Sequence, residues 1–148
     1  MPHFTLQIES GGPILQALAA ISQPRAAALT AAGHPVPRAV PIRALVDTGA
    51  SCTCVDPSVL IALSLAPTGK VSLTTPSTGT TPHEADQYDM GLVIPATTGS
   101  LPLVLQTIPV VSSDLLLAQG FHALIGRDIL DRCLFVYNGD VRLFTLAF

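Results

Sequence analysis

Residues 44–51 read Ala44-Leu45-Val46-Asp47-Thr48-Gly49-Ala50-Ser51. An apolar, strand-forming run therefore ends on a carboxylate, and Thr-Gly turns the chain directly after it. Burying a carboxylate beside Leu45 and Val46 costs several kcal/mol unless other groups compensate, which favours a functional acid. An aspartate in an ordinary β-turn is the alternative, because Asp-Thr-Gly occurs by chance in about one chain of this length in forty.

A second informative segment follows further along the chain. Residues 123–130 read Ala-Leu-Ile-Gly-Arg-Asp-Ile-Leu, which predicts a short strand over 122–125 and a short helix over 127–132. Taken alone, the Gly-Arg-Asp in it is an ordinary strand-to-helix turn. Between the two segments, residues 70–75 and 88–94 predict the strands of a long hairpin, whose tip at 76–82 is small, polar and turn-forming.

In this order and spacing, the two segments and the hairpin resemble the retropepsins, the single-domain aspartic proteases of retroviruses and their bacterial relatives. The resemblance covers residues 38–148. It implies that Asp47 is catalytic, that the Thr48 hydroxyl braces two active loops across a dimer, and that Gly49 lets the backbone approach the substrate. It further implies that Gly126 packs beneath the catalytic loop and that Arg127 ties the short helix to that loop.

The same resemblance implies where a peptide binds. The residues expected to contact the substrate come from the catalytic loop, the hairpin tip and the second segment: Ala50, Ser51, Thr78, Gly79, Thr80, Leu124 and Ile125. With Val46, the apolar members predict a cleft for extended peptides with hydrophobic residues flanking the cut. Retropepsins often carry an acid at the position of Ser51 that pairs with the arginine. We therefore expect Arg127 to lack this partner or to bind Asp128 or a backbone carbonyl instead.

Hydrolysis by this route needs two carboxylates, one ionised to take a proton from water and one protonated to polarise the carbonyl. The chain has a single Asp-Thr-Gly; Thr97-Thr98-Gly99 lacks an acid and Asp89-Met90-Gly91 lies within a predicted strand. The second carboxylate must then come from another copy, with Asp47 of each copy near a two-fold axis. Residues 4–9 and 143–148 are expected to interleave between the two copies as an interface sheet.

The composition fits a partner that is another copy of this chain. Apolar residues make up 49% of the 148 residues and charged residues 11%, so some apolar surface is expected to be covered by an interface. Seven basic residues and a net charge of −3 argue against nucleic-acid binding. The longest apolar run, 14–32, is broken at 22–25, so we expect no membrane span. An odd number of cysteines and no secretory signal favour the cytoplasm.

The remaining pattern predicts one all-β domain over residues 1–148, a retropepsin-like acid protease barrel with a short C-terminal helix. Strands are expected at 3–9, 40–46 and 101–111, and Asn138-Gly139 predicts a two-residue hairpin loop between 133–137 and 141–148. Asp56-Pro57 predicts the start of a helix that ends near Leu63. Residues 14–32 predict a helix interrupted at Pro24, within an N-terminal helical insertion spanning 10–37.

Three alternatives remain open. The fold is also compatible with a non-catalytic module for peptide binding or dimerisation, or with a monomeric precursor that first trims itself within 10–37. Cys52 and Cys54, with Cys133 and His122, suggest a metal site, but structural zinc sites usually have two to four residues between cysteines and here there is one. We expect buried free thiols instead, with no metal and no cofactor.

Overall fold

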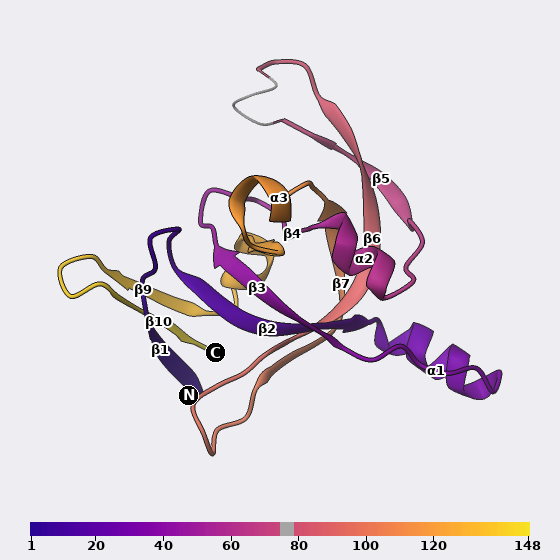
Figure 1. The fold of residues 1–148 in the computed structure, drawn as a ribbon, viewed down its shortest axis with the longest axis horizontal. Helices are drawn as coiled ribbons and strands as arrows, with labels where there is room; N and C mark the ends of the chain where they lie inside the picture. The colour runs from indigo at the N-terminus through magenta and orange to yellow at the C-terminus, as the bar shows by residue number, and fades with distance from the viewer. Residues whose placement is uncertain (75–78) are drawn as a thin grey trace.

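Two β-sheets form most of the protein (Figure 1). The structure, a computed structural model, describes residues 1–74 and 79–148. The larger sheet contains seven of the strands in the described part of the chain. In spatial order they are β2 (Ile14–Ile21), β3 (Val40–Val46), β8 (Ala123–Ile125), β4 (Cys54–Val55), β7 (Leu103–Ser112), β6 (His83–Ile94) and β5 (Gly69–Leu73).

The larger sheet closes on itself. β2 pairs with β3 on one side and antiparallel with β6 on the other, with Leu18 opposite Val93 and Ile21 opposite Met90. Six strands thus form a barrel, and β5 extends it as the outer strand of the β5–β6 hairpin. This arrangement confirms the predicted all-β barrel class.

Period-two burial explains why these segments form strands. Along β3, Ile42, Ala44 and Val46 point into the barrel, while the residues between them are more exposed. In β2 the same alternation buries Ala17 and Ala19. The barrel core also takes in Met90 and Leu92 of β6, so one continuous apolar cluster holds the sheet together.

The smaller sheet covers one end of the barrel. It contains β1 (His3–Gln7), β10 (Leu143–Ala147) and β9 (Leu134–Asn138) in that order. Its inner face buries Phe4 and Phe144, whose rings meet edge to face with centroids 6.1 Å apart. The sheet is therefore joined to the main core through aromatic contacts.

The helices are short. They are α1 (Gln23–Ala31), α2 (Pro57–Ala62), α3 (Leu116–Gln119) and α4 (Arg127–Leu130). α1 has no buried residue and projects from the barrel, whereas α2 and α4 each bury two. α2 begins as predicted, with Asp56 as N-cap and Pro57 in the first turn. Within the described part of the chain, none of the helices has the length and hydrophobicity needed to cross a bilayer.

The helix predicted over 14–32 is only half correct. Residues 14–21 form β2, and the helix starts at Gln23, so Pro24 lies in its first turn and does not interrupt it. Alanine and leucine favour a helix locally, but β3 and β6 each offer β2 a pairing edge, and this long-range pairing prevails. The helical part of the insertion is thus limited to α1, while β2 is part of the barrel.

The hairpin predicted for the C-terminal segment is corrected in its loop. The hairpin between β9 and β10 exists, but Asn138 pairs with Leu143, which leaves a four-residue loop where two residues were predicted. Arg142 in that loop has a φ of 53°. Within one chain β1 pairs with β10, Thr5 opposite Thr145, and the interleaving of the terminal segments with a second copy stays a prediction.

Candidate active site

Asp47 lies directly after β3, at the point where β3 runs parallel to β8. Val46 is opposite Ile125, and the Asp47 amide donates to the Ile125 carbonyl oxygen at 3.0 Å. On its other side, the Val46 amide donates to the carbonyl oxygen of Pro13 at 3.0 Å. Backbone bonds from both sides thus fix the residue that carries the carboxylate.

The loop after Asp47 is a tight turn held partly by its own carboxylate. Oδ1 of Asp47 accepts a hydrogen bond from the Gly49 amide at 2.9 Å, and the Ala50 amide donates to the Asp47 carbonyl oxygen at 3.2 Å. A Cβ at Gly49 would lie 3.1 Å from Oδ1, so glycine suits this position. Asp47 itself is half-buried, while Thr48 and Gly49 are exposed at the tip of the turn.

Arg127 binds the loop that follows Asp47 through backbone carbonyl groups. Its Nη1 donates to the carbonyl oxygen of Thr48 at 2.9 Å and to that of Gly49 at 3.3 Å. Its amide donates to the Ala50 carbonyl oxygen at 2.9 Å. Of the alternatives left open for Arg127, the structure shows the backbone carbonyl.

Gly126 packs against the same loop, as the resemblance implied. A Cβ at this position would lie 2.5 Å from the carbonyl carbon and 2.6 Å from the carbonyl oxygen of Cys52. These are backbone atoms, which cannot move aside as the end of a long side chain can. Only glycine allows the end of β8 and the loop after Asp47 to approach this closely.

A pair formed by the buried Thr53 and the half-buried Asp128 connects to the loop and was not foreseen from the sequence. Thr53 donates from its amide to Oδ2 of Asp128 at 3.0 Å and from Oγ1 to Oδ1 at 2.9 Å. The Thr53 hydroxyl also accepts from the Gly126 amide at 3.2 Å. This pair joins the loop after Asp47 to the start of α4.

A cleft of about 860 Å³ opens beside Asp47, within the range of small-ligand and peptide sites. One wall is the β5–β6 hairpin, which rises above α3 in Figure 1. The hairpin residues that line the cleft are Leu73, Thr74, His83 and Ala85. They lie nearer the base of the hairpin than the predicted tip residues do.

A second part of the lining comes from β4, β8, the end of β7 and the turn that follows it. It consists of Cys54, Leu124, Ser112, Ser113 and Asp114. Burial raises the pKa of the Cys54 thiol to about 12, and the adjacent Cys52 adds to the rise, so Cys54 acts as a small apolar residue here. Cys133 packs against the main core, away from these two thiols.

The predicted substrate-binding residues fall into three groups. Ala50, Ser51 and Leu124 line the cleft. Val46 and Ile125 are corrections, because both side chains are buried in the barrel core and face away from solvent. Gly79 and Thr80 are exposed but lie outside the cleft lining, and Thr78 falls outside the described residues.

The turn that carries Asp114 is held by a buried acid, Asp56. Oδ2 of Asp56 accepts from the amides of Leu115 and Leu116 at 2.9 and 2.8 Å, and Oδ1 accepts from the Ser58 amide at 3.0 Å. Burial raises the pKa of Asp56, but these hydrogen bonds outweigh it and hold the pKa well below its usual range. Asp56 thus accepts hydrogen bonds from the amides of Leu115 and Leu116 at the start of α3.

The fold has a counterpart among solved structures. The structure is similar to the crystal structure of a retropepsin-like aspartic protease from Rickettsia conorii, with a TM-score of 0.56. The two chains are 18% identical, and the match covers 97% of this chain and 89% of that one. This chain has a retropepsin-like fold.

The structure also resembles, less closely, the retroviral protease-like domain of Ddi1 from Leishmania major. It matches with a TM-score of 0.39 and 13% identity over 85% of this chain and 82% of that one. No protein-family model and no curated protein matches the chain. The retropepsin-like fold thus rests on the structure, and the chemistry depends on the residues of the site.

Proposed function

We propose that this protein is an aspartic endopeptidase that is active as a homodimer. The observation that carries the proposal is the position of Asp47, half-buried on a rigid turn and lining a cleft large enough for a peptide. Arg127 donates a hydrogen bond to the backbone of that turn, and Gly126 packs against the backbone of Cys52, which follows it. Preorganised acids in a cleft are typical of hydrolytic sites.

In the proposed mechanism, a water lies between the Asp47 carboxylates of two copies. One carboxylate is ionised and removes a proton from the water, which attacks the peptide carbonyl carbon. The other is protonated and donates a hydrogen bond to the carbonyl oxygen. When the resulting tetrahedral intermediate collapses, the C–N bond breaks and the leaving amine nitrogen takes the proton that the first carboxylate removed from the water. Two carboxylates this close share one proton, so the pair titrates as a unit. No covalent intermediate forms and no metal takes part.

The outer face of the small sheet is the surface we assign to the second copy. Its exposed apolar side chains are Leu134 and Val136 on β9 and Leu143 on β10, beside Thr5 and Thr145. None of these is charged. The loop that follows β9 contacts the turn before β2, where Arg142 Nη2 donates to the Ile8 carbonyl oxygen at 3.0 Å.

That turn is hydrogen-bonded to β3, the strand that ends at Asp47. Along the chain the turn continues to Pro13, whose carbonyl oxygen accepts a hydrogen bond from the Val46 amide. The small sheet is thus connected, through few residues, to the strand end that carries Asp47. With Thr48 and Gly49 exposed, a two-fold axis beside the loop would place the Thr48 hydroxyls in reach of each other.

Substrates are proposed to be extended peptides with apolar residues beside the cut. Leu73, Ala85, Ala50 and Leu124 give the cleft apolar walls. The β5–β6 hairpin would close over a bound peptide and exclude water. The three free thiols suit a reducing compartment, so we propose a cytoplasmic location for this single-domain protein.

The test compares the parent protein with Asp47→Asn at mildly acidic pH. A mixed peptide library is incubated with each, and products are identified by mass spectrometry, while sedimentation measures the oligomeric state. The expected result is cleavage by the dimeric parent and none by the variant, whose size and melting temperature stay unchanged. Asp140→Asn, which changes an exposed acid in the β9–β10 loop, is the matched control.

Two outcomes would contradict the proposal. Equal cleavage by the parent and Asp47→Asn would remove Asp47 from catalysis. Peptides bound but left intact by the parent would favour the non-catalytic peptide-binding module.

A further inference from the structure

We propose that Asp114 gives the cleft a preference for peptides that carry a lysine or arginine beside the apolar residues. The inference rests on the proposed function in one respect, namely that the cleft beside Asp47 receives a peptide. It adds a charge requirement that apolar walls alone do not supply.

The backbone on both sides of Asp114 is fixed. Before it, the Ser113 amide donates to the Val55 carbonyl oxygen at 3.0 Å, which continues the parallel pairing of β7 with β4. After it, the Leu115 and Leu116 amides donate to the buried carboxylate of Asp56. Because the flanking residues are anchored, Asp114 occupies a defined place on the cleft wall.

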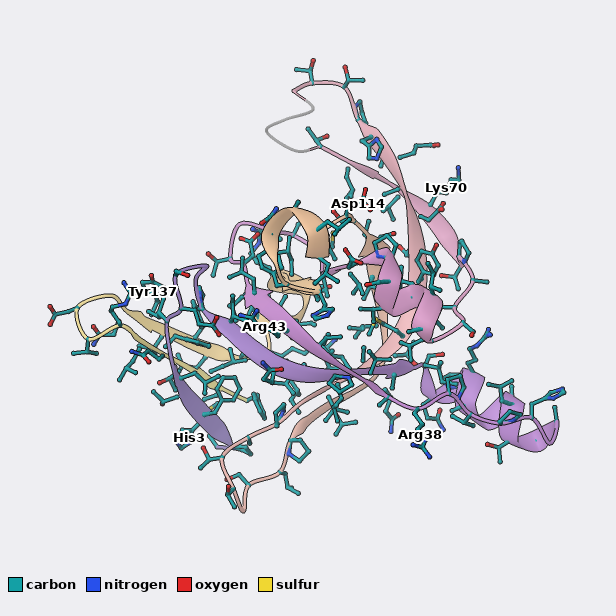
Figure 2. The ribbon with its side chains drawn as sticks, in the orientation of Figure 1. His3, Arg38, Arg43, Lys70, Asp114 and Tyr137 are labelled. Atoms are coloured by element: carbon teal, nitrogen blue, oxygen red, sulfur yellow. The ribbon has the colours of Figure 1, made fainter. Side chains whose placement is uncertain are left out.

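The charges that line the cleft are negative. Asp47 and Asp114 supply the carboxylates, and among the described residues that line it no lysine or arginine offsets them. The only basic side chain of the described lining is His83. Figure 2 shows Asp114 between α3 and the hairpin and Lys70 on β5, the outer strand of that hairpin.

Lys70 on the hairpin and Arg127 beside the Asp47 loop are both engaged elsewhere. Lys70 Nζ lies 3.9 Å from Oε2 of Glu84 on the hairpin, and the Arg127 guanidinium binds the carbonyl groups of the catalytic loop. Neither ion pair found within residues 1–74 and 79–148 involves Asp114. Asp114 is exposed and available to a cation brought by a ligand.

The apolar walls decide which cation fits. Leu124 lies beside Cys54, its partner across β8 and β4, so the cleft lining that includes the Asp114 turn also offers an apolar patch. Lysine and arginine combine an aliphatic stem, which packs on such a wall, with a charged end that reaches a carboxylate. An acidic side chain of similar reach would be repelled by Asp47 and Asp114 together.

The experiment measures binding apart from cleavage. Octapeptides of alternating leucine and alanine, each with lysine at one position, are titrated against the uncleaving Asp47→Asn protein by fluorescence anisotropy. Matched series replace the lysine with norleucine, which keeps the stem without the charge, or with glutamate. The same peptides are titrated against Asp47→Asn with Asp114→Asn, and against Asp47→Asn with Asp140→Asn as the charge-matched control.

At one or more positions, lysine is expected to bind about fivefold more tightly than norleucine, which is the scale of a partly exposed ion pair. Asp114→Asn should remove that preference, and Asp140→Asn should keep it. The inference is overturned if lysine and norleucine bind alike at every position, if the preference survives Asp114→Asn, or if no peptide binds at millimolar concentration. Failure of the parent to cleave these peptides would count against the proposed catalysis alone, because the binding preference is read from the uncleaving protein.

Discussion

The Nη1 atom of Arg127 donates a hydrogen bond to the carbonyl oxygen of Thr48 at 2.9 Å. The same nitrogen lies 3.3 Å from the carbonyl oxygen of Gly49. One guanidinium therefore binds the carbonyl groups of Thr48 and Gly49, although position 51 carries a serine and not the acid that often pairs with this arginine. A charged donor to a backbone carbonyl is a stronger bond than a neutral one, so the loop is held without a salt bridge.

We predict that Arg127→Gln loosens the catalytic loop more than it destabilises the fold. Arg127 is exposed, so the loss in the free energy of unfolding should be about 1 kcal/mol. Turnover should fall at least tenfold, since a displaced Asp47 no longer aligns the water. Urea denaturation and peptide cleavage check the two parts. Arg132→Gln, an equal charge change at an exposed position after α4, should leave both unchanged; if it has the same effect, the loop contact is not the cause.

Gly126→Ala should destabilise the protein by roughly 3 kcal/mol or prevent folding. The added methyl group would lie 2.5 Å from a backbone carbon of Cys52, and β8 is paired on both sides and cannot shift. Gly69→Ala is the control, since its Cβ meets nothing within 4 Å, and it should change stability by less than about 0.5 kcal/mol. Thermal unfolding of both variants decides the matter, and similar melting temperatures would contradict the close packing.

Local signals in the sequence predicted the parts of the site that depend on local geometry. The run into Asp47 gave a strand followed by a turn, and the Asp56-Pro57 pair gave the start of α2. Both depend on the conformations that a few neighbouring residues favour. The glycine at 126 was predicted from its place in a family pattern, and the structure supplies the physical reason in its contact with Cys52.

Contacts between distant residues could not be predicted in this way. Residues 14–21 are rich in alanine and leucine, and they become a strand only because β3 and β6 are present. Asp56 was recognised as a helix cap, but its bonds to Leu115 and Leu116 join residues about sixty apart. The Thr53–Asp128 bonds are likewise invisible without the fold. Polar residues of this kind give no periodic pattern that reveals their partner.

Val136→Lys should weaken the proposed dimer. Val136 is 47% exposed and lies in the middle of β9, an edge strand of the small sheet, with its side chain on the outer face opposite Thr145. A two-fold interface would bring in two new lysines at once, and burying unpaired charges should raise the dimer dissociation constant at least tenfold. Sedimentation at several concentrations measures this, and cleavage should fall in parallel. Ile61→Lys, a similar change at an exposed position of α2, should leave the dimer intact. A dimer that survives Val136→Lys would place the interface elsewhere.

The last prediction concerns the buried carboxylate of Asp56 and the pH at which the protein is stable. Its folded-state pKa lies below that of an unfolded chain, which is about 4, so the ionised group stabilises the fold above that pH. That contribution is lost as the pH falls from about 4 toward the folded pKa. Asp56→Asn should cost about 1 to 2 kcal/mol at neutral pH, because an uncharged acceptor makes weaker bonds to the amides of α2 and α3.

The difference in stability between the parent and Asp56→Asn should therefore shrink below about pH 4 and stay constant above pH 5. Urea denaturation at a series of pH values measures it, with Asp140→Asn as the exposed control that stays within about 0.5 kcal/mol of the parent throughout. A difference that does not change with pH would mean that Asp56 acts through packing and not through its charge. If the prediction holds, Asp56 remains ionised at the mildly acidic pH chosen to test the proposed cleavage, so the turn that carries Asp114 keeps its shape under those conditions.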